Sequence, residues 1–160
     1  MLALALTADL VGVTDLVPLD TPEEPYFYTF KVQCTSCRET HPNYVSLSRF
    51  ESNEVSGSKG EANFVWRCKS CKRESSASIK NAPQIYSQAS PPHRQNIIEI
   101  DCRGLEFVDF KCDGEWIANG LESSTKFSGI DLQEGEWFDY DEKAGDEVSI
   151  KDVKWELKRA

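Results

Sequence analysis

The sequence lacks the patterns that mark several large classes of protein. No apolar run among its 160 residues is long enough to span a bilayer, so we expect no membrane association. Apolar residues are not spaced at i, i+3 and i+4 over any long stretch, and turn-forming residues recur too often for long helices. No G-x-S-x-G motif supports a Ser-His-Asp triad, and no glycine-rich loop is present to bind phosphate. These absences favour a mostly β protein that is not an enzyme.

Positive charge is also scarce. The chain has 18 Lys and Arg against 27 Asp and Glu, which gives a formal net charge of −9. Because affinity for nucleic acid depends largely on Lys and Arg that neutralise phosphates, we expect no nucleic-acid partner. Many acidic residues gather within residues 134–147. Such a run is more often a solvated face, but Trp137 and Tyr140 within it favour a surface that contacts another protein.

The first residues raise the question of a secretory signal. A basic start is missing, and Asp9 and Asp15 interrupt the apolar run, so we interpret this segment as a strand. Six cysteines without a signal indicate a reducing compartment, where paired cysteines favour metal over disulfides. We expect a monomeric protein in the cytoplasm, with access to the nucleus.

The most informative residues are two C-x-x-C pairs. Knuckle 1 (residues 34–37) carries Cys34 and Cys37, and knuckle 2 (residues 68–71) carries Cys68 and Cys71. Two residues between cysteines let both sulfurs turn inward on one tight loop, and two facing loops surround a tetrahedral Zn²⁺ with four thiolates. The gap between the knuckles exceeds the ~15–20 residues usual in zinc ribbons, so we expect an extra hairpin or loop there. We predict one Zn²⁺ per chain on these four cysteines.

The knuckles are unusual in the residue that follows each second cysteine and in the basic residues that surround them. Glycine often follows the second cysteine, because the backbone there favours positive φ, whereas this chain has Arg38 and Lys72. Basic residues also surround both knuckles, and we interpret them as offsetting the negative charge of four thiolates rather than as an RNA patch. The basic residues near the cysteines are Lys31, Arg38, Arg67, Lys69, Lys72 and Arg73.

Redox chemistry is the main alternative for a C-x-x-C pair. A thioredoxin-type enzyme needs one such pair at a helix N-terminus, and neither pair precedes a helical pattern. Cys102 and Cys112 lie in the apolar phase of predicted strands, so we interpret them as core thiols rather than as a disulfide, ligand or redox pair. With four cysteines available, His41 and His93 are not needed as ligands.

Alternating apolar residues predict strands along the whole chain, beginning with a half-buried strand at residues 2–6. Each knuckle follows an aromatic strand and leads into another strand, as in a zinc ribbon. Residues 51–63 are predicted to be a polar turn between hairpin arms, and Asp113-Gly114 a hairpin turn. Val108, Phe110 and Cys112 share one predicted strand face. Phase changes predict a bulge or bend between Leu6 and Val11 and a bulge at 151–152.

The layout favours a single compact zinc-binding β domain over residues 1–160. Its two halves, residues 1–82 and 93–160, show a similar order of strands and turns, and a Pro-rich linker at 83–92 joins them. We therefore predict pseudo-repeat halves, with the zinc-ribbon-like pair of knuckles in the first half.

Several stretches, in the same order along almost the entire chain, resemble the eukaryotic CXXC-motif-containing zinc-binding proteins. They are the two knuckles, residues 101–106 (DCRGLE), 108–110 (VDF), 119–123 (NGLES), 131–134 (DLQE), Trp137 and residues 139–144 (DYDEKA). The resemblance implies a pseudo-barrel or sandwich of two related halves with one zinc on Cys34, Cys37, Cys68 and Cys71. It implies no established enzymatic activity.

Together these observations predict a non-catalytic zinc-binding protein whose surface contacts an unidentified protein partner. The alternative is a metal-handling or redox-sensing protein with an exchangeable zinc. A third hypothesis, an enzyme site around Arg103, Glu106 and Asp109, is explained equally well by a charged turn.

Overall fold

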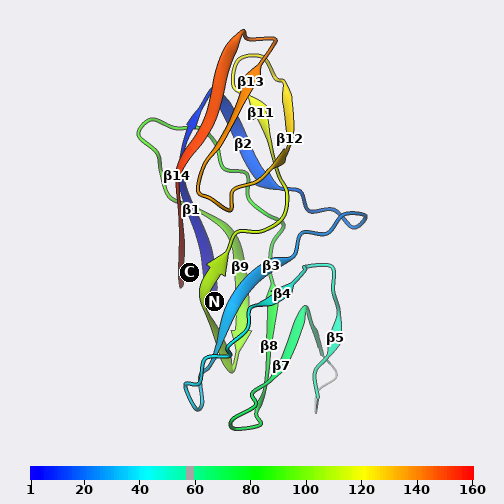
Figure 1. Cartoon of the computed structure of the whole chain (residues 1–160). Coiled ribbons are helices and arrows are strands. Elements are labelled where there is room, and N and C mark those ends of the chain that lie inside the picture. The colour runs from blue at the N-terminus through cyan, green and yellow to red at the C-terminus, as the bar shows by residue number, and fades with distance from the viewer. Residues whose placement is uncertain (57–59) are drawn as a thin grey trace.

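The computed structural model describes residues 1–56 and 60–160, and all regular elements in these ranges are β-strands (Figure 1). This arrangement confirms the mostly β fold predicted from the sequence. The same residues include no helix with the length and apolarity that a membrane span requires.

The largest sheet has six strands in the order β13-β14-β1-β9-β8-β7. These strands are β1 (Leu2–Val11), β7 (Phe64–Arg67), β8 (Glu74–Ile79), β9 (Gln95–Arg103), β13 (Trp137–Asp141) and β14 (Asp146–Arg159). Every pairing in this sheet is antiparallel.

Three smaller sheets complete the fold. They have the orders β10-β3-β4, β12-β11-β2 and β5-β6. Their strands are β2 (Val13–Pro18), β3 (Tyr28–Cys34), β4 (Val45–Leu47), β5 (Asn53–Glu54), β6 (Glu61–Ala62), β10 (Leu105–Lys111), β11 (Trp116–Gly120) and β12 (Lys126–Ile130). The short β5–β6 pair lies within the predicted polar turn at residues 51–63, of which residues 57–59 lie outside the described residues.

Strand β1 lies inside the six-stranded sheet, between β14 and β9. Leu4 and Leu6 are fully buried, as their alternation predicts, but Ala3 and Ala5 on the opposite phase are buried too. The prediction of a half-buried strand was therefore wrong. Alanine is small enough to fit either a covered or a solvent-facing surface, so its position in the pattern does not show which face it occupies.

The chain bends at Gly12, directly after β1. This residue has φ +76°, and a Cβ built there would lie 2.7 Å from Cγ1 of Val148. Both the positive φ and the close approach require glycine. The bend sends β2 away from the six-stranded sheet to pair with β11.

One register shift confirms both the predicted slip near the C-terminus and the predicted irregularity between Leu6 and Val11. Thr7 pairs with Lys154, whereas Asp9 pairs with Lys151, so the register of β1 against β14 shifts between them. Asp152, at this bulge, has φ 54°. The shift explains why the apolar phase of the sequence changes along one long strand.

Two predictions about residues 105–117 were wrong. Asp113-Gly114 does not join a hairpin, because β10 pairs with β3 whereas β11 pairs with β12 and β2. A bulge between Phe107 and Asp109 also reverses the phase of β10. Phe107 and Phe110 are therefore buried, while Val108 is 46% exposed.

The two predicted halves contribute strands to the same large sheet. Strand β1 of the first half pairs with β9 and β14 of the second, and β8 pairs with β9. The predicted linker is packed rather than free, since Tyr86 forms an antiparallel bridge with Leu16 of β2. The pseudo-repeat relationship of the halves stays a prediction.

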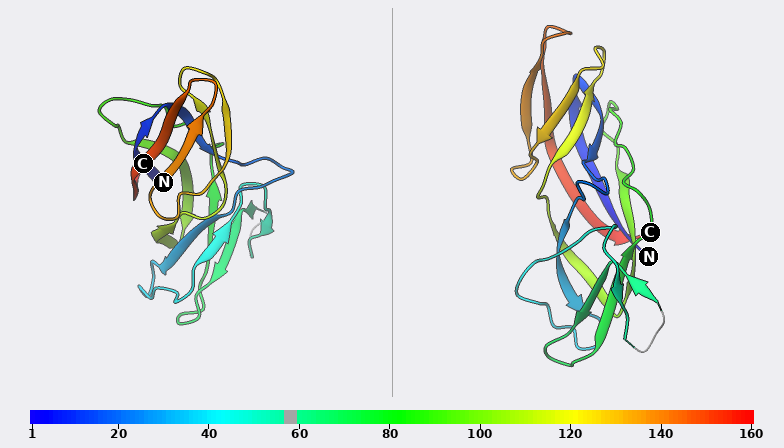
Figure 2. Two further views of the ribbon diagram at one scale, coloured as in Figure 1. Left: turned by 45° about the horizontal axis from the view of Figure 1, so that its top comes forward. Right: turned by 90° about the vertical axis from the view of Figure 1, so that its right-hand side faces the viewer.

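The molecule is elongated, as Figure 1 and Figure 2 show. The ends of β3 and β7, which carry the knuckles, lie at one end, and the β13–β14 hairpin lies at the other. The chain termini lie side by side near the middle, where the Ala160 N–H donates to the Met1 carbonyl at 3.0 Å.

Candidate metal centre

The two knuckles have the same backbone architecture. In knuckle 1 the Arg38 N–H donates to the Cys34 carbonyl at 2.9 Å, and in knuckle 2 the Lys72 N–H donates to the Cys68 carbonyl at 2.9 Å. The N–H of each first cysteine donates back across its turn, to the carbonyls of Glu39 and Arg73 respectively. Each C-x-x-C is therefore a tight turn at the end of a strand.

The residue after each second cysteine adopts positive φ, at 65° for Arg38 and 66° for Lys72. The knuckle geometry expected for glycine is thus present without glycine. A side chain holds the carbonyl of each strained residue: Gln33 Nε2 donates to the Arg38 carbonyl at 3.1 Å, and Arg67 Nη1 donates to the Lys72 carbonyl at 2.8 Å. The supporting role of these two residues was not predicted, although both immediately precede the first cysteine of a knuckle.

The structure brings all four predicted cysteines together. Their Sγ atoms lie within 4.8 Å of one another, with Cys34–Cys71 at 3.6 Å and Cys37–Cys68 at 3.5 Å. Four sulfurs at about 2.3 Å from a tetrahedral Zn²⁺ would lie about 3.8 Å apart. The donor type and the spacing therefore both fit zinc.

Burial differs between the cysteines of each pair. Cys34 and Cys68 are buried, Cys71 is half-buried and Cys37 is exposed. The first cysteine of each knuckle is thus shielded by protein, whereas the second cysteine lies closer to solvent.

Backbone N–H groups of the knuckles favour thiolates at the two buried cysteines. Hydrogen bonds from the Cys37 and Ser36 backbones lower the pKa of Cys34 to about 7 despite desolvation. The backbones of Cys71 and Ser70 lower the pKa of Cys68 in the same way. The turns are therefore built to stabilise negative sulfur, which is the form that binds a metal.

The β9–β10 turn bonds knuckle 1 and packs closely against β8, the strand that follows knuckle 2. The Thr35 N–H of knuckle 1 donates to the Gly104 carbonyl at 3.1 Å. On the side of knuckle 2, a Cβ built on Gly104 would lie 2.7 Å from Oγ of Ser75 in β8, and Gly104 has φ +83°. Gly104 lies within the stretch 101–106 that resembles the family, but its positioning role required the structure.

The remaining cysteines and the histidines lie outside the four-cysteine group in the part of the chain that the structure describes. Cys112 is buried in the core, as predicted. His41 lies edge-on to Trp66 with ring centroids 6.0 Å apart, and His93 stacks on Tyr86 at 4.8 Å.

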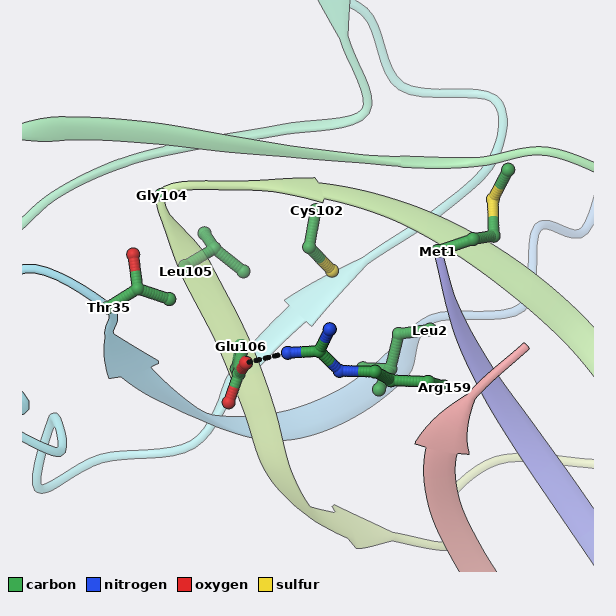
Figure 3. Close-up of a pocket in the computed structure, with 8 residues that line it drawn as sticks. All are labelled: Met1, Leu2, Thr35, Cys102, Gly104, Leu105, Glu106 and Arg159. Atoms are coloured by element: carbon green, nitrogen blue, oxygen red, sulfur yellow. Dashed lines mark ion pairs between the residues drawn. The ribbon is translucent and has the colours of Figure 1, made fainter.

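Cys102 is half-buried and lines a pocket of about 210 Å³ beside knuckle 1. Figure 3 shows its side chain pointing towards the Glu106–Arg159 ion pair, with Thr35 and Gly104 on the same pocket wall. Desolvation raises the pKa of Cys102 to about 12, so its thiol stays protonated at neutral pH. Desolvation likewise raises the pKa of Cys112 to about 12.

The three charged residues considered for an enzyme site have different partners. Arg103 contacts Asp101 at 3.4 Å, Glu106 contacts Arg159 at 3.9 Å, and the Asp109 carboxylate accepts from the Tyr44 hydroxyl. These contacts are those of charged surface side chains along β9 and β10.

Comparison with known proteins places the four-cysteine fold in a family. The model of the eukaryotic CXXC motif containing zinc binding protein family matches residues 3–158. The chain belongs to this family. Among its relatives, the UPF0587 protein C2D10.03c of Schizosaccharomyces pombe is 45% identical over 158 residues, covering 99% of this chain and 98% of that protein. The Homo sapiens CXXC motif containing zinc binding protein is 37% identical, covering 95% of this chain and 94% of that protein.

Solved structures share the fold of this family member. The crystal structure of C1orf123 superposes with a TM-score of 0.91 at 36% identity and 99% coverage of both chains. A hypothetical protein from Plasmodium falciparum superposes with a TM-score of 0.86 at 20% identity and 98% coverage of both chains, which shows the fold alone.

Proposed function

We propose that this chain is a non-catalytic zinc-binding protein in which one Zn²⁺ on Cys34, Cys37, Cys68 and Cys71 holds the two knuckles together. The observation that carries the proposal is the group of four Sγ atoms within 4.8 Å of one another. Four thiolates fill a tetrahedral shell, which leaves no open position for water or substrate. Lewis-acid catalysis needs such a position, so a structural role is favoured.

The position of the knuckles supports a structural metal. Strand β3, before knuckle 1, belongs to a three-stranded sheet, whereas β7, before knuckle 2, is an edge of the six-stranded sheet. A metal shared by the two knuckles would crosslink two sheets. Because the free energy of binding at such a site is largely free energy of folding, loss of zinc would loosen this end of the molecule.

The first experiment is to measure zinc content and then to add chelator in steps while circular dichroism follows the fold. The proposal expects one zinc per chain, whose removal is accompanied by loss of part of the β signal. A Cys68→Ser variant should lose zinc and stability together. Cys102→Ser is the matched control, because this half-buried cysteine lies outside the four-cysteine group. A Cys68→Ser protein that loses zinc and keeps full stability would contradict the structural role.

One observation favours a second function, in which the zinc is exchangeable and the protein handles metal or senses oxidation. Cys37 is exposed, so a partner's ligand or an oxidant can reach this sulfur directly. Under this alternative a colorimetric chelator would remove zinc quickly, or after mild peroxide, while the β signal stays. A structural zinc would resist both treatments.

The proposal also covers the protein's localisation, its oligomeric state and the class of its partner. We propose a cytoplasmic monomer with access to the nucleus, which contacts another protein and not nucleic acid. The net charge of −9 supports this partner class, since it disfavours phosphate binding. Sedimentation velocity and a salt-dependent RNA-binding assay test the monomer and the absence of RNA affinity.

A further inference from the structure

A double groove lies at the end of the molecule opposite the knuckles, on the part of the large sheet formed by β13, β14 and β1 (Figure 1). Two hollows of about 580 and 630 Å³ share Val11, Tyr140, Glu147 and Val148 in their walls, so they form one continuous surface. We call it the β13 groove. Leu121 and Gly145 line one hollow, and Phe138 and Lys151 line the other.

Large apolar side chains in this groove are exposed to an unusual degree. Phe138 is 58% exposed, Tyr140 51%, Val11 50% and Leu121 46%. Phe138 pairs with Ser149 and Ser149 pairs with Val11, so Phe138 and Val11 lie on one face of β13, β14 and β1. Contiguous exposed apolar surface of this kind is rare on a monomer and marks interaction sites.

The fold does not need these side chains. Trp137 and Asp141 of the same strand already face inward, Trp137 against Phe127 at 5.5 Å and Asp141 against Ser123 and Thr125. Phe138 and Tyr140 alternate with them and face the groove. Within the described residues, β14 alone pairs with β13, so β13 is also an edge strand with an unpaired side.

The charged residues around the groove are mostly acidic. Glu122, Asp139, Asp146 and Glu147 line it, and none of these four carboxylates has an ion-pair partner among residues 1–56 and 60–160. The single basic residue in its walls, Lys151, lies over the Phe138 ring at 5.6 Å from the centroid. An occupant is therefore attracted if it brings apolar side chains together with lysine or arginine.

We propose that the β13 groove binds an extended segment of a partner protein in which apolar residues alternate with lysine or arginine. The apolar side chains would cover Phe138, Tyr140 and Val11, and the basic side chains would meet the acidic rim. This inference deepens the proposed protein-contact role and identifies its surface and the chemistry of the partner. It does not depend on the zinc being structural or exchangeable, because the knuckles lie at the opposite end.

The test uses zinc-loaded full-length protein and a short fluorescein-labelled peptide in which leucine alternates with lysine. Fluorescence anisotropy should show saturable binding that weakens as salt is raised. Two control peptides replace either leucine by serine or lysine by glutamate, and both should bind at least about tenfold more weakly. Amide chemical shifts should move at β13 and at residues 11–12, and not at the knuckles.

Variants distinguish peptide binding in the β13 groove from nonspecific binding elsewhere on the protein surface. Phe138→Ser combined with Tyr140→Ser should lower affinity about tenfold or more, and Asp146→Asn combined with Glu147→Gln should reduce both affinity and its salt dependence. Ile85→Ser is the matched control, since Ile85 is 51% exposed and lies outside the groove. Unchanged binding by the groove variants, or equal binding of all three peptides, would overturn the proposal.

A second copy of the chain is the alternative occupant of the β13 groove. If sedimentation shows a concentration-dependent dimer that the Phe138→Ser, Tyr140→Ser variant abolishes, the groove belongs to a second copy of the chain and the proposal is wrong. Zinc content is measured on the same samples, so failure of peptide binding with zinc intact leaves the proposed metal site standing.

Discussion

The guanidinium of Arg67 donates a 2.8 Å hydrogen bond to the carbonyl oxygen of Lys72, closing the turn that carries Cys68 and Cys71. Gln33 makes the equivalent bond to Arg38 in the other knuckle at 3.1 Å. Both acceptor residues have positive φ, which costs an L-residue about 1–2 kcal/mol. A side chain on the preceding strand thus stabilises each strained turn, in the place where other knuckles have glycine.

The Arg67–Lys72 bond makes knuckle 2 sensitive to a single exposed side chain. We expect Arg67→Ala to lower the free energy of unfolding by about 1 kcal/mol and to speed zinc release, because the Lys72 carbonyl loses its partner. Arg73→Ala is the control, since no side-chain hydrogen bond or ion pair of Arg73 is found in the described residues. Urea unfolding of the zinc-loaded proteins measures the difference, and equal midpoints for the two variants would contradict this role.

Gly104 should matter to the metal centre although it carries no side chain. An alanine Cβ there would lie 2.7 Å from Ser75 Oγ and disturb the turn that accepts the Thr35 N–H. We expect Gly104→Ala to destabilise the protein by about 1–3 kcal/mol and to make zinc easier to extract. Gly129 also has positive φ, at +65°, but a Cβ built there would have nothing within 4 Å. Gly129→Ala is therefore the control that measures backbone strain without a steric clash. Chelator titration should separate the two variants.

The strands before the knuckles and the four cysteines could be predicted because their signals are local. Period-two alternation predicts β3 and β7, and C-x-x-C spacing points to a metal without knowledge of the fold. The bulge at residues 151–152 was predictable for the same reason, since a phase change along β14 is visible in the sequence.

Strand partners could not be predicted in the same way. Asp113-Gly114 has the residues of a hairpin turn, yet the strand before it pairs with β3 and the strand after it with β2. These partners are distant in sequence and are selected by packing of the core. The bulge after Phe107 reverses the face of Val108 without any break in the apolar pattern. Supporting residues such as Gln33 were missed because polar residues beside a cysteine have no distinctive spacing.

Two adjacent buried tyrosines should respond in opposite ways to loss of the hydroxyl. Tyr26 Oη accepts from Trp116 Nε1 at 3.2 Å and donates to the Asp113 carbonyl. The Tyr28 hydroxyl is buried with no hydrogen-bond partner among the residues that the structure describes. We expect Tyr26→Phe to cost about 1–3 kcal/mol, because a buried N–H is left unpaired. Tyr28→Phe should be neutral or stabilising, and thermal unfolding of the pair measures the contrast.

Asp141 should contribute stability that depends on pH. The Ser123 hydroxyl, the Thr125 hydroxyl at 2.8 Å and the backbone N–H groups of Ala144 and Lys143 lower the pKa of this buried carboxyl. Because its folded pKa lies below the unfolded value of about 3.9, its stabilisation is present above that pH and is lost as pH falls through the folded pKa.

The corresponding measurement compares Asp141→Asn with the unchanged protein by urea unfolding at several pH values. Asp141→Asn should be less stable at neutral pH, and the difference should shrink once pH falls below about 4. Glu142→Gln, at an exposed neighbouring position, should show neither effect. A stability difference that stays constant across this range would show that the charge of Asp141 is not responsible.

Removal of zinc should loosen one end of the molecule and not the other. The knuckles join β3 and β7, which belong to different sheets, whereas the β13–β14 hairpin is at the far end and is held by pairing of β14 with β1. We expect chelation to raise amide hydrogen exchange at residues 28–47 and 64–79, while Val148 and Ile150 keep their protection. The Phe107 ring packs 6.3 Å from Phe64 across the same two sheets, so this contact should weaken as well. Uniform loss of protection would instead mean that the whole domain unfolds with the metal, and unchanged protection at the knuckles would argue for a metal that is cargo rather than structure.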